Sequence, residues 1–74
     1  MDRVLLEQHF AQAREHVATG EKNVARQREL VEQMVRDGHD PTMARQSLAQ
    51  FEELLVMHIA DRDRMEKELA ENSE

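Results

Sequence analysis

The short stretch Asp37-Gly38-His39-Asp40-Pro41 decides the fold of this 74-residue chain. Gly38 suits the left-handed backbone conformation that follows the end of a helix. Asp40 suits a helix N-cap, and Pro41 suits the first turn of the next helix. The stretch therefore predicts that one helix ends and a second begins across a loop at residues 38–40. A loop this short makes the two helices antiparallel neighbours.

The residues on either side of this stretch favour helices. Ala, Glu, Gln, Arg, Leu and Met dominate the chain, whereas Pro41 is the single proline and Gly20 and Gly38 are the two glycines. We therefore expect one all-α domain over residues 1–74, with a first helix over about residues 2–37 and a second over about residues 41–71. The apolar period continues through Gly20, which favours one unbroken first helix over a kink.

Apolar residues recur with a period of about 3.5 residues in both helices, which is the pattern of coiled-coil packing. In the first helix these seam positions are Arg3, Leu6, Phe10, Ala13, Val17, Gly20, Val24, Gln27, Val31 and Met34. In the second helix they are Ala44, Leu48, Phe51, Leu55, His58, Arg62, Met65 and Leu69. The predicted fold is an antiparallel two-helix coiled-coil hairpin, in which the polar residues Gln27 and Arg62 help to set the register.

Folding the chain at the loop brings small and large seam residues together, as close packing requires. It places Gly20 opposite His58 and Val24 opposite Leu55. Charges beside the seam then pair across the two helices, as Arg14 with Glu66, Arg28 with Glu52, His9 with Glu68 and His16 with Asp61. Each such pair contributes about 0.2–1 kcal/mol, so the pairs select the register more than they stabilise the hairpin.

A second apolar stripe on one side of the hairpin indicates self-association. The stripe consists of Ala18, Ala25, Val56 and Ile59. A domain of this size is marginal alone and has no cysteine for a disulfide, so a further buried surface would stabilise it. We therefore predict a homodimer, a four-helix bundle of two hairpins, with this stripe at its interface. An alternative interface on the opposite side would use Leu30 and Leu54.

The formal net charge of -6 argues against two classes of partner, because nucleic acids and anionic membranes both repel an acidic surface. Arg26, Arg28, Arg36 and Arg45 could cluster near the loop, but acidic residues interrupt them, so we expect no nucleic-acid partner. The longest apolar run, residues 54–57, is too short to span a bilayer. A chain without cysteine fits the reducing cytoplasm, and we expect a cytoplasmic protein with no membrane partner.

Three residues invite a chemical interpretation. His58 and Asp61 share a helical face and His16 lies across from Asp61, so together they offer nitrogen and oxygen ligands for a metal ion. Arg62 on the same seam would repel a cation, and we favour a structural role in which His58 packs on Gly20 and bonds a carboxylate. A small metal- or pH-responsive regulator using these histidines stays open as the alternative. No phosphate loop or paired acid and base is evident, so we expect neither catalytic residues nor a cofactor.

Four motifs carry a resemblance: Arg26-Gln27-Arg28-Glu29, Asp37-Gly38-His39-Asp40, Phe51-Glu52-Glu53 and His58-Ile59-Ala60-Asp61-Arg62-Asp63-Arg64. Together they resemble a pattern in short uncharacterised proteobacterial helical proteins, over roughly residues 16–69. The resemblance implies a bacterial origin and no particular activity, substrate or cofactor. The function predicted for this chain is a non-enzymatic protein–protein interaction or structural module.

Overall fold

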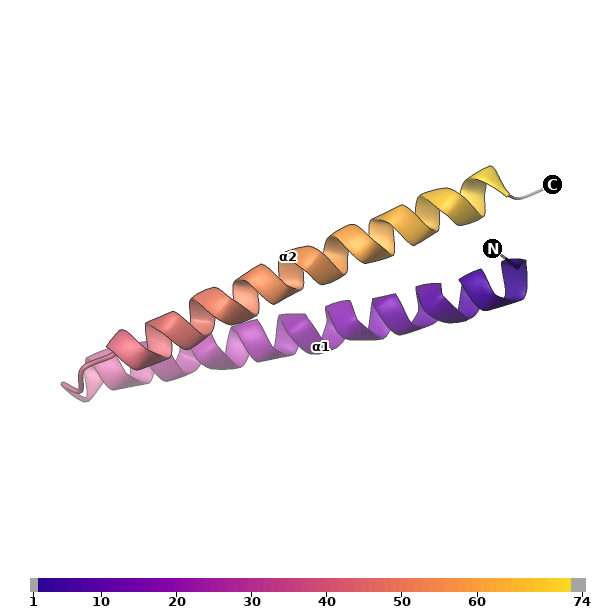
Figure 1. The fold of residues 1–74 in the computed structure, drawn as a ribbon. Coiled ribbons are helices and arrows are strands. Elements are labelled where there is room, and N and C mark those ends of the chain that lie inside the picture. The colour runs from indigo at the N-terminus through magenta and orange to yellow at the C-terminus, as the bar shows by residue number, and fades with distance from the viewer. Residues whose placement is uncertain (1, 73–74) are drawn as a thin grey trace.

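The computed structural model describes residues 2–72 and consists of two long helices, α1 (Arg3–Arg36) and α2 (Thr42–Glu71), which lie antiparallel (Figure 1). The fold is a rod of 58 × 14 × 13 Å, with the loop at one end and the start of α1 beside the end of α2 at the other. The predicted all-α hairpin is confirmed over these residues. Each predicted helix boundary lies within one residue of the observed boundary.

The end of α1 is a Schellman motif built around Gly38. This glycine has a φ of 74°, in the left-handed region that side chains disfavour. Its N–H donates to the carbonyl oxygen of Val35 at 3.2 Å, and the N–H of His39 donates to the carbonyl oxygen of Met34 at 2.9 Å. Both bonds satisfy carbonyls that a helix end leaves without an intrahelical donor. The turn therefore forms where the glycine stands.

Asp40 binds the first residue of α2. Its Oδ1 accepts a hydrogen bond from the backbone N–H of Thr42 at 3.1 Å and another from the Thr42 hydroxyl at 2.6 Å. The hydroxyl bond is the main reason that the pKa of Asp40 lies below its ordinary value, and the backbone bond lowers it further. The helix begins at Thr42 with Pro41 at its N-cap, so the N-cap prediction for Asp40 is wrong by one residue, and Asp40 bonds the helix start from the position before the N-cap.

The hydrophobic core is a narrow line of side chains between the helices. The buried residues are Leu6, Ala13, Val17 and Val24 of α1 and Ala44 of α2. All five stand at predicted seam positions, so the predicted contact stripe is confirmed where the packing is tightest. The bulky seam residues of α2 are only half-buried; they are Leu48, Phe51, Leu55, Met65 and Leu69.

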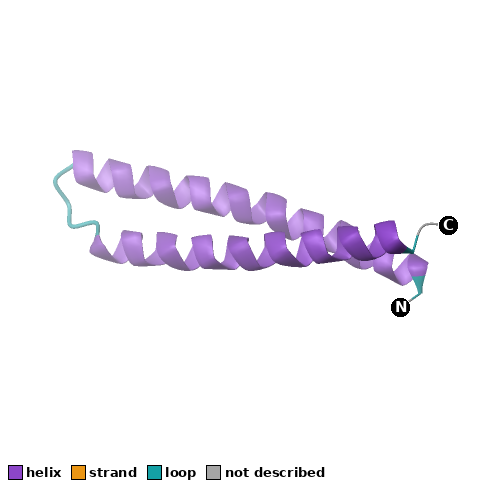
Figure 2. Ribbon diagram, turned by 90° about the horizontal axis from the view of Figure 1, so that it is seen from above, coloured by secondary structure: helices purple, strands orange, loops and turns teal. Residues whose placement is uncertain are grey.

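The two helices wind around each other. In the view of Figure 1 they overlap near the loop and separate toward the chain ends, whereas in the perpendicular view of Figure 2 they separate near the loop and overlap toward the chain ends. Such winding is what a seam with a period of about 3.5 residues imposes on helices of 3.6 residues per turn. The supercoil keeps the seam between the helices along the length of the rod.

The observed cross-helix contacts confirm one predicted ion pair and show how Gly20 packs. Arg28 and Glu52 approach to 3.6 Å, as predicted, and theirs is the one ion pair that joins α1 to α2 within residues 2–72. A Cβ placed on Gly20 would meet Leu55 Cδ1 at 3.1 Å, so Leu55 packs closest to this glycine. His58, the predicted partner of Gly20, lines a surface hollow together with it. Side chains in a coiled coil insert between the layers of the facing helix, so one residue can contact more than one layer.

Candidate functional site

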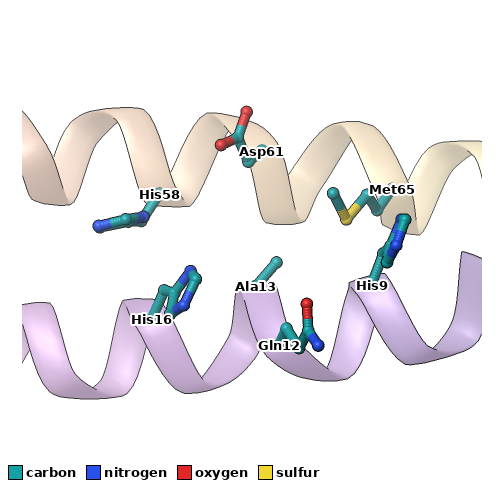
Figure 3. A pocket seen from close by; sticks show the side chains of 7 residues that line it. All are labelled: His9, Gln12, Ala13, His16, His58, Asp61 and Met65. Atoms are coloured by element: carbon teal, nitrogen blue, oxygen red, sulfur yellow. The ribbon is translucent and has the colours of Figure 1, made fainter.

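A groove runs along one side of the seam of the described hairpin. It consists of two hollows of about 280 and 140 Å³ that share His16 and His58. The larger hollow is drawn in Figure 3; it is lined by His9, Gln12, Ala13, His16, His58, Asp61 and Met65. The smaller hollow is lined by His16, Thr19, Gly20, Asn23, Phe51, Leu54 and His58. The groove therefore lies across the middle of the rod, between both helices.

Small residues on α1 produce the groove. Ala13 and Gly20 occupy seam positions where a longer side chain would otherwise fill the space beside α2. Gly20 also lets α2 approach closely, since Leu55 rests against its backbone. The sequence already indicated a hollow here, because the smallest seam residues of α1 stand one turn before and one turn after His16.

Two histidines face each other across the groove. The ring centres of His16 and His58 lie 5.0 Å apart, with their planes inclined at 53°. His58 is half-buried and His16 is exposed. The predicted proximity of these two residues is confirmed, and they come from the middle of α1 and the middle of α2 (Figure 3).

Asp61 does not complete a three-ligand site with these histidines. Its carboxylate is turned away from both rings in Figure 3, and its Oδ1 lies 3.4 Å from the guanidinium of Arg64 on its own helix. Within residues 2–72, no group of three or more histidine, aspartate or glutamate side chains is arranged to hold a metal ion. The arrangement of His16, His58 and Asp61 considered as a metal site is therefore not formed.

Two arginines near the seam contact residues of their own helices. Arg62 stands at a predicted seam position, and its Nε and Nη2 donate to Asp63 Oδ1 at 3.0 and 2.9 Å. Arg14 was predicted to face Glu66, and its guanidinium instead lies over the ring of Phe10, 5.8 Å from its centre. These contacts are local, because flexible side chains at a partly open seam reach neighbours on the same helix at less entropic cost.

The predicted dimer residues lie on the side opposite the groove. Ala25 stands one turn before Arg28, and Val56 stands one turn after Glu52, the two residues that form the cross-helix ion pair. Ala18 and Ala25 are exposed, Ile59 is half-buried, and Val56 is 66% exposed. We call this side the bridge face, consisting of Ala18, Ala25, Val56 and Ile59. Their heptad positions place these four residues on one side of the hairpin, and their role in a dimer stays a prediction.

The sequence interpretation gave less weight to the groove side. Leu54 borders the smaller hollow and is 48% exposed, and Met57, one turn further along α2, is 62% exposed. Leu30, on the same side of α1, is 43% exposed. We call this side the groove face, consisting of the two hollows with Leu30, Leu54 and Met57. The run of apolar residues from 54 to 57 already indicated that α2 has apolar groups on more than one side.

Comparisons with known proteins do not identify a relative: no protein-family model, curated protein or solved structure matches the chain. Neither helix of the described residues 2–72 has a segment that is both long and apolar enough to cross a bilayer.

Proposed function

We propose that this protein is a non-enzymatic interaction module that works as a homodimer, two hairpins packed into a four-helix bundle. One observation carries the proposal: the isolated hairpin leaves α2 incompletely packed. Ala44 is the only buried residue of the fully described helix Thr42–Glu71. Large apolar residues of the same helix are exposed, among them Met43, Leu54, Val56 and Met57.

The energetics of a small domain favour covering these residues. Complete burial of a Val, Leu or Met side chain stabilises a protein by about 1.5–3 kcal/mol. Two of the five buried residues in the hairpin are alanines, which contribute less because they have little apolar surface. A second hairpin laid along the first would bury several larger residues at once, and it needs no disulfide or metal.

The shape and chemistry fit a structural role better than catalysis. The rod is 58 Å long and offers extended helical surfaces, the kind of surface that binds another helix through residues spaced three or four apart. The polar groups of the groove are three imidazoles, two amides, the Thr19 hydroxyl and a carboxylate already paired with Arg64. We infer a bacterial, cytoplasmic module whose partners are proteins. The resemblance supports the bacterial origin, the cysteine-free sequence supports the cytoplasm, and the acidic charge supports protein partners over nucleic acids.

Sedimentation equilibrium of the full chain over a concentration series tests the proposal. We expect a mass of twice the 8.7 kDa chain at micromolar concentrations, falling toward one chain on dilution. A measurement of mass is essential, because an elongated monomer elutes early from a gel-filtration column and imitates a dimer. A single-chain mass at every concentration up to hundreds of micromolar would reject the homodimer.

A further inference from the structure

The hairpin has two long sides that could bind a second copy, and they differ in the size of their apolar residues. The bridge face has two alanines, the exposed Val56 and the half-buried Ile59. The groove face has the longer side chains of Leu30, Leu54 and Met57, all exposed. Phe51 adds part of its ring to the smaller hollow. Covering the groove face would therefore remove more apolar surface from water.

The two sides also differ in charge. Each copy of the chain has a net charge of -6, so two copies repel each other, and the docking side must bring few carboxylates together. The bridge face is flanked by Glu52, which pairs with Arg28, and by Asp63, two turns after Val56. On the groove face the larger hollow includes Asp61, which pairs with Arg64, whereas no carboxylate, lysine or arginine lines the smaller hollow. Electrostatics therefore favours docking over the smaller hollow, where no carboxylate has to be covered.

The groove face supplies both a protrusion and a recess at the same height along the rod. Leu54 and Met57 project near the middle of α2, and the recess beside Thr19, Gly20 and Asn23 lies near the middle of α1. A two-fold dimer requires that one surface fit a copy of itself. Because protrusion and recess lie at the same height on different helices, a two-fold axis that runs along the rod in the plane of this face brings each protrusion to the other copy's recess.

The size of the face matches a second copy. A side of 58 × 14 Å has an area of roughly 800 Å², which is about what each partner of a stable complex buries. Leu30, Leu54 and Met57 lie within roughly 15 Å of one another along the rod, because Leu30 is level with Leu48 and helices rise about 1.5 Å per residue. The middle part of a second hairpin is long enough to cover all three.

We infer that a second copy of this chain docks on the groove face, with Leu54 and Met57 of each copy inserted beside Thr19, Gly20 and Asn23 of the other. The inference rests on the proposed homodimer and assigns its interface. It adopts the alternative interface with Leu30 and Leu54 in place of the favoured prediction, which used the bridge face.

Two matched charge substitutions on α2 test the assignment. Leu54→Glu places a carboxylate on the groove face, and Val56→Glu places one on the bridge face two residues away. We expect Leu54→Glu to weaken the dimer by roughly hundredfold, since the carboxylate would be desolvated at the centre of the interface, and Val56→Glu to weaken it by less than about threefold. Helical circular dichroism of both variants, recorded at the same concentration, checks that each hairpin remains folded.

The possible outcomes distinguish a wrong interface assignment from the absence of a dimer. Dissociation by Val56→Glu alone, by both variants equally, or by neither overturns the groove assignment while the wild-type dimer stands. A wild-type monomer rejects the proposed function before either variant is made.

Thiol footprinting gives a second measurement that does not depend on introducing a charge. The chain has no cysteine, so the Met57→Cys and Val56→Cys variants each carry one thiol. We expect the alkylation rate of Met57→Cys to fall by about tenfold or more between dilute and concentrated protein, because docking covers that position. The rate of Val56→Cys should stay constant. Protection of Val56→Cys without protection of Met57→Cys would contradict the inference.

Discussion

The two helices differ in how far the hairpin completes their packing. α1 buries Leu6, Ala13, Val17 and Val24 in a continuous stripe, whereas α2 buries only Ala44 within residues 42–71. The small seam residues of α1 are covered by the larger side chains of α2, and those larger side chains are themselves only half-buried. The difference teaches that α1 obtains its core from the hairpin, and that α2 has apolar surface left for a second hairpin.

The largest expected effect compares two valines, one on each helix. Val24→Asp should unfold the hairpin, because Val24 is 4% exposed and an unpaired buried carboxylate costs about 3 kcal/mol or more. Val56→Asp should change the free energy of unfolding by less than about 0.5 kcal/mol, because Val56 is largely exposed. Far-ultraviolet circular dichroism during urea titration measures both. Equal destabilisation by the two substitutions would contradict the difference between the helices.

The second comparison concerns Gly20, where the helices approach closely. Gly20→Val should destabilise the hairpin by about 1–3 kcal/mol, since even its Cβ would lie 3.1 Å from Leu55 Cδ1. Leu55→Ala in the same chain should recover part of this loss, because it removes the side chain that clashes. Thermal melts of the two single variants and the double variant form the required cycle. Strictly additive losses would show that Gly20 and Leu55 are not in contact.

Substitution of Asp40 at the start of α2 should change the stability of the fold by a smaller amount, and this change should depend on pH. The pKa of Asp40 is lowered in the folded state, chiefly by the Thr42 hydroxyl, so the cap stabilises the fold above the ordinary carboxyl pKa. This stabilisation is lost as the pH falls through the lowered pKa of the folded state, below about pH 4. Asp40→Asn keeps an acceptor oxygen but does not titrate, and Asp40→Ala removes the cap.

The melting temperatures of the three proteins at pH 7 and pH 3 measure the contribution of this cap. We expect Asp40→Ala to melt below the wild type at pH 7 and the difference to narrow at pH 3. Asp40→Asn should stay closer to the wild type at pH 7. If the difference in melting temperature between Asp40→Ala and the wild type is the same at pH 7 and pH 3, the charge of Asp40 does not contribute to the stability.

The smallest expected effect is that of metal ions. His16 and His58 lie close together, but the Asp61 carboxylate is turned away, so only two of the ligands that a zinc site requires are gathered. Zinc or a chelator should therefore leave the melting temperature unchanged, in the wild type and in His58→Gln alike. A zinc-dependent rise that His58→Gln abolishes would establish a metal site and favour the regulator alternative.

The hairpin itself could be predicted from local signals. Gly38 has the role that its conformational preference implies, and the heptad period identified every buried residue among residues 2–72. Asp40 bonds the first residue of α2 from one position before the predicted one, because Pro41 occupies the N-cap. A sequence pattern aligns the layers of the two helices, but it does not show that Leu55 packs closest to Gly20.

The candidate site was harder to predict, because it depends on side-chain directions. Several charged neighbours offer Arg62 and Arg64 ion pairs of similar energy. The sequence therefore does not determine that Arg62 pairs with Asp63 and Arg64 with Asp61. The groove arises where Ala13 and Gly20 leave space beside His58, and its volume cannot be obtained from residue spacing alone.

Small-angle X-ray scattering over a concentration series tests most directly whether a second hairpin completes the packing that α2 lacks. It reports the mass and the longest dimension of the particle in the same sample. We expect twice the chain mass of 8.7 kDa with a longest dimension close to the 58 Å of one hairpin, because the two rods lie side by side. A single-chain mass at high concentration would contradict this packing. So would a dimer about twice as long, in which the chains have opened at the loop and exchanged helices.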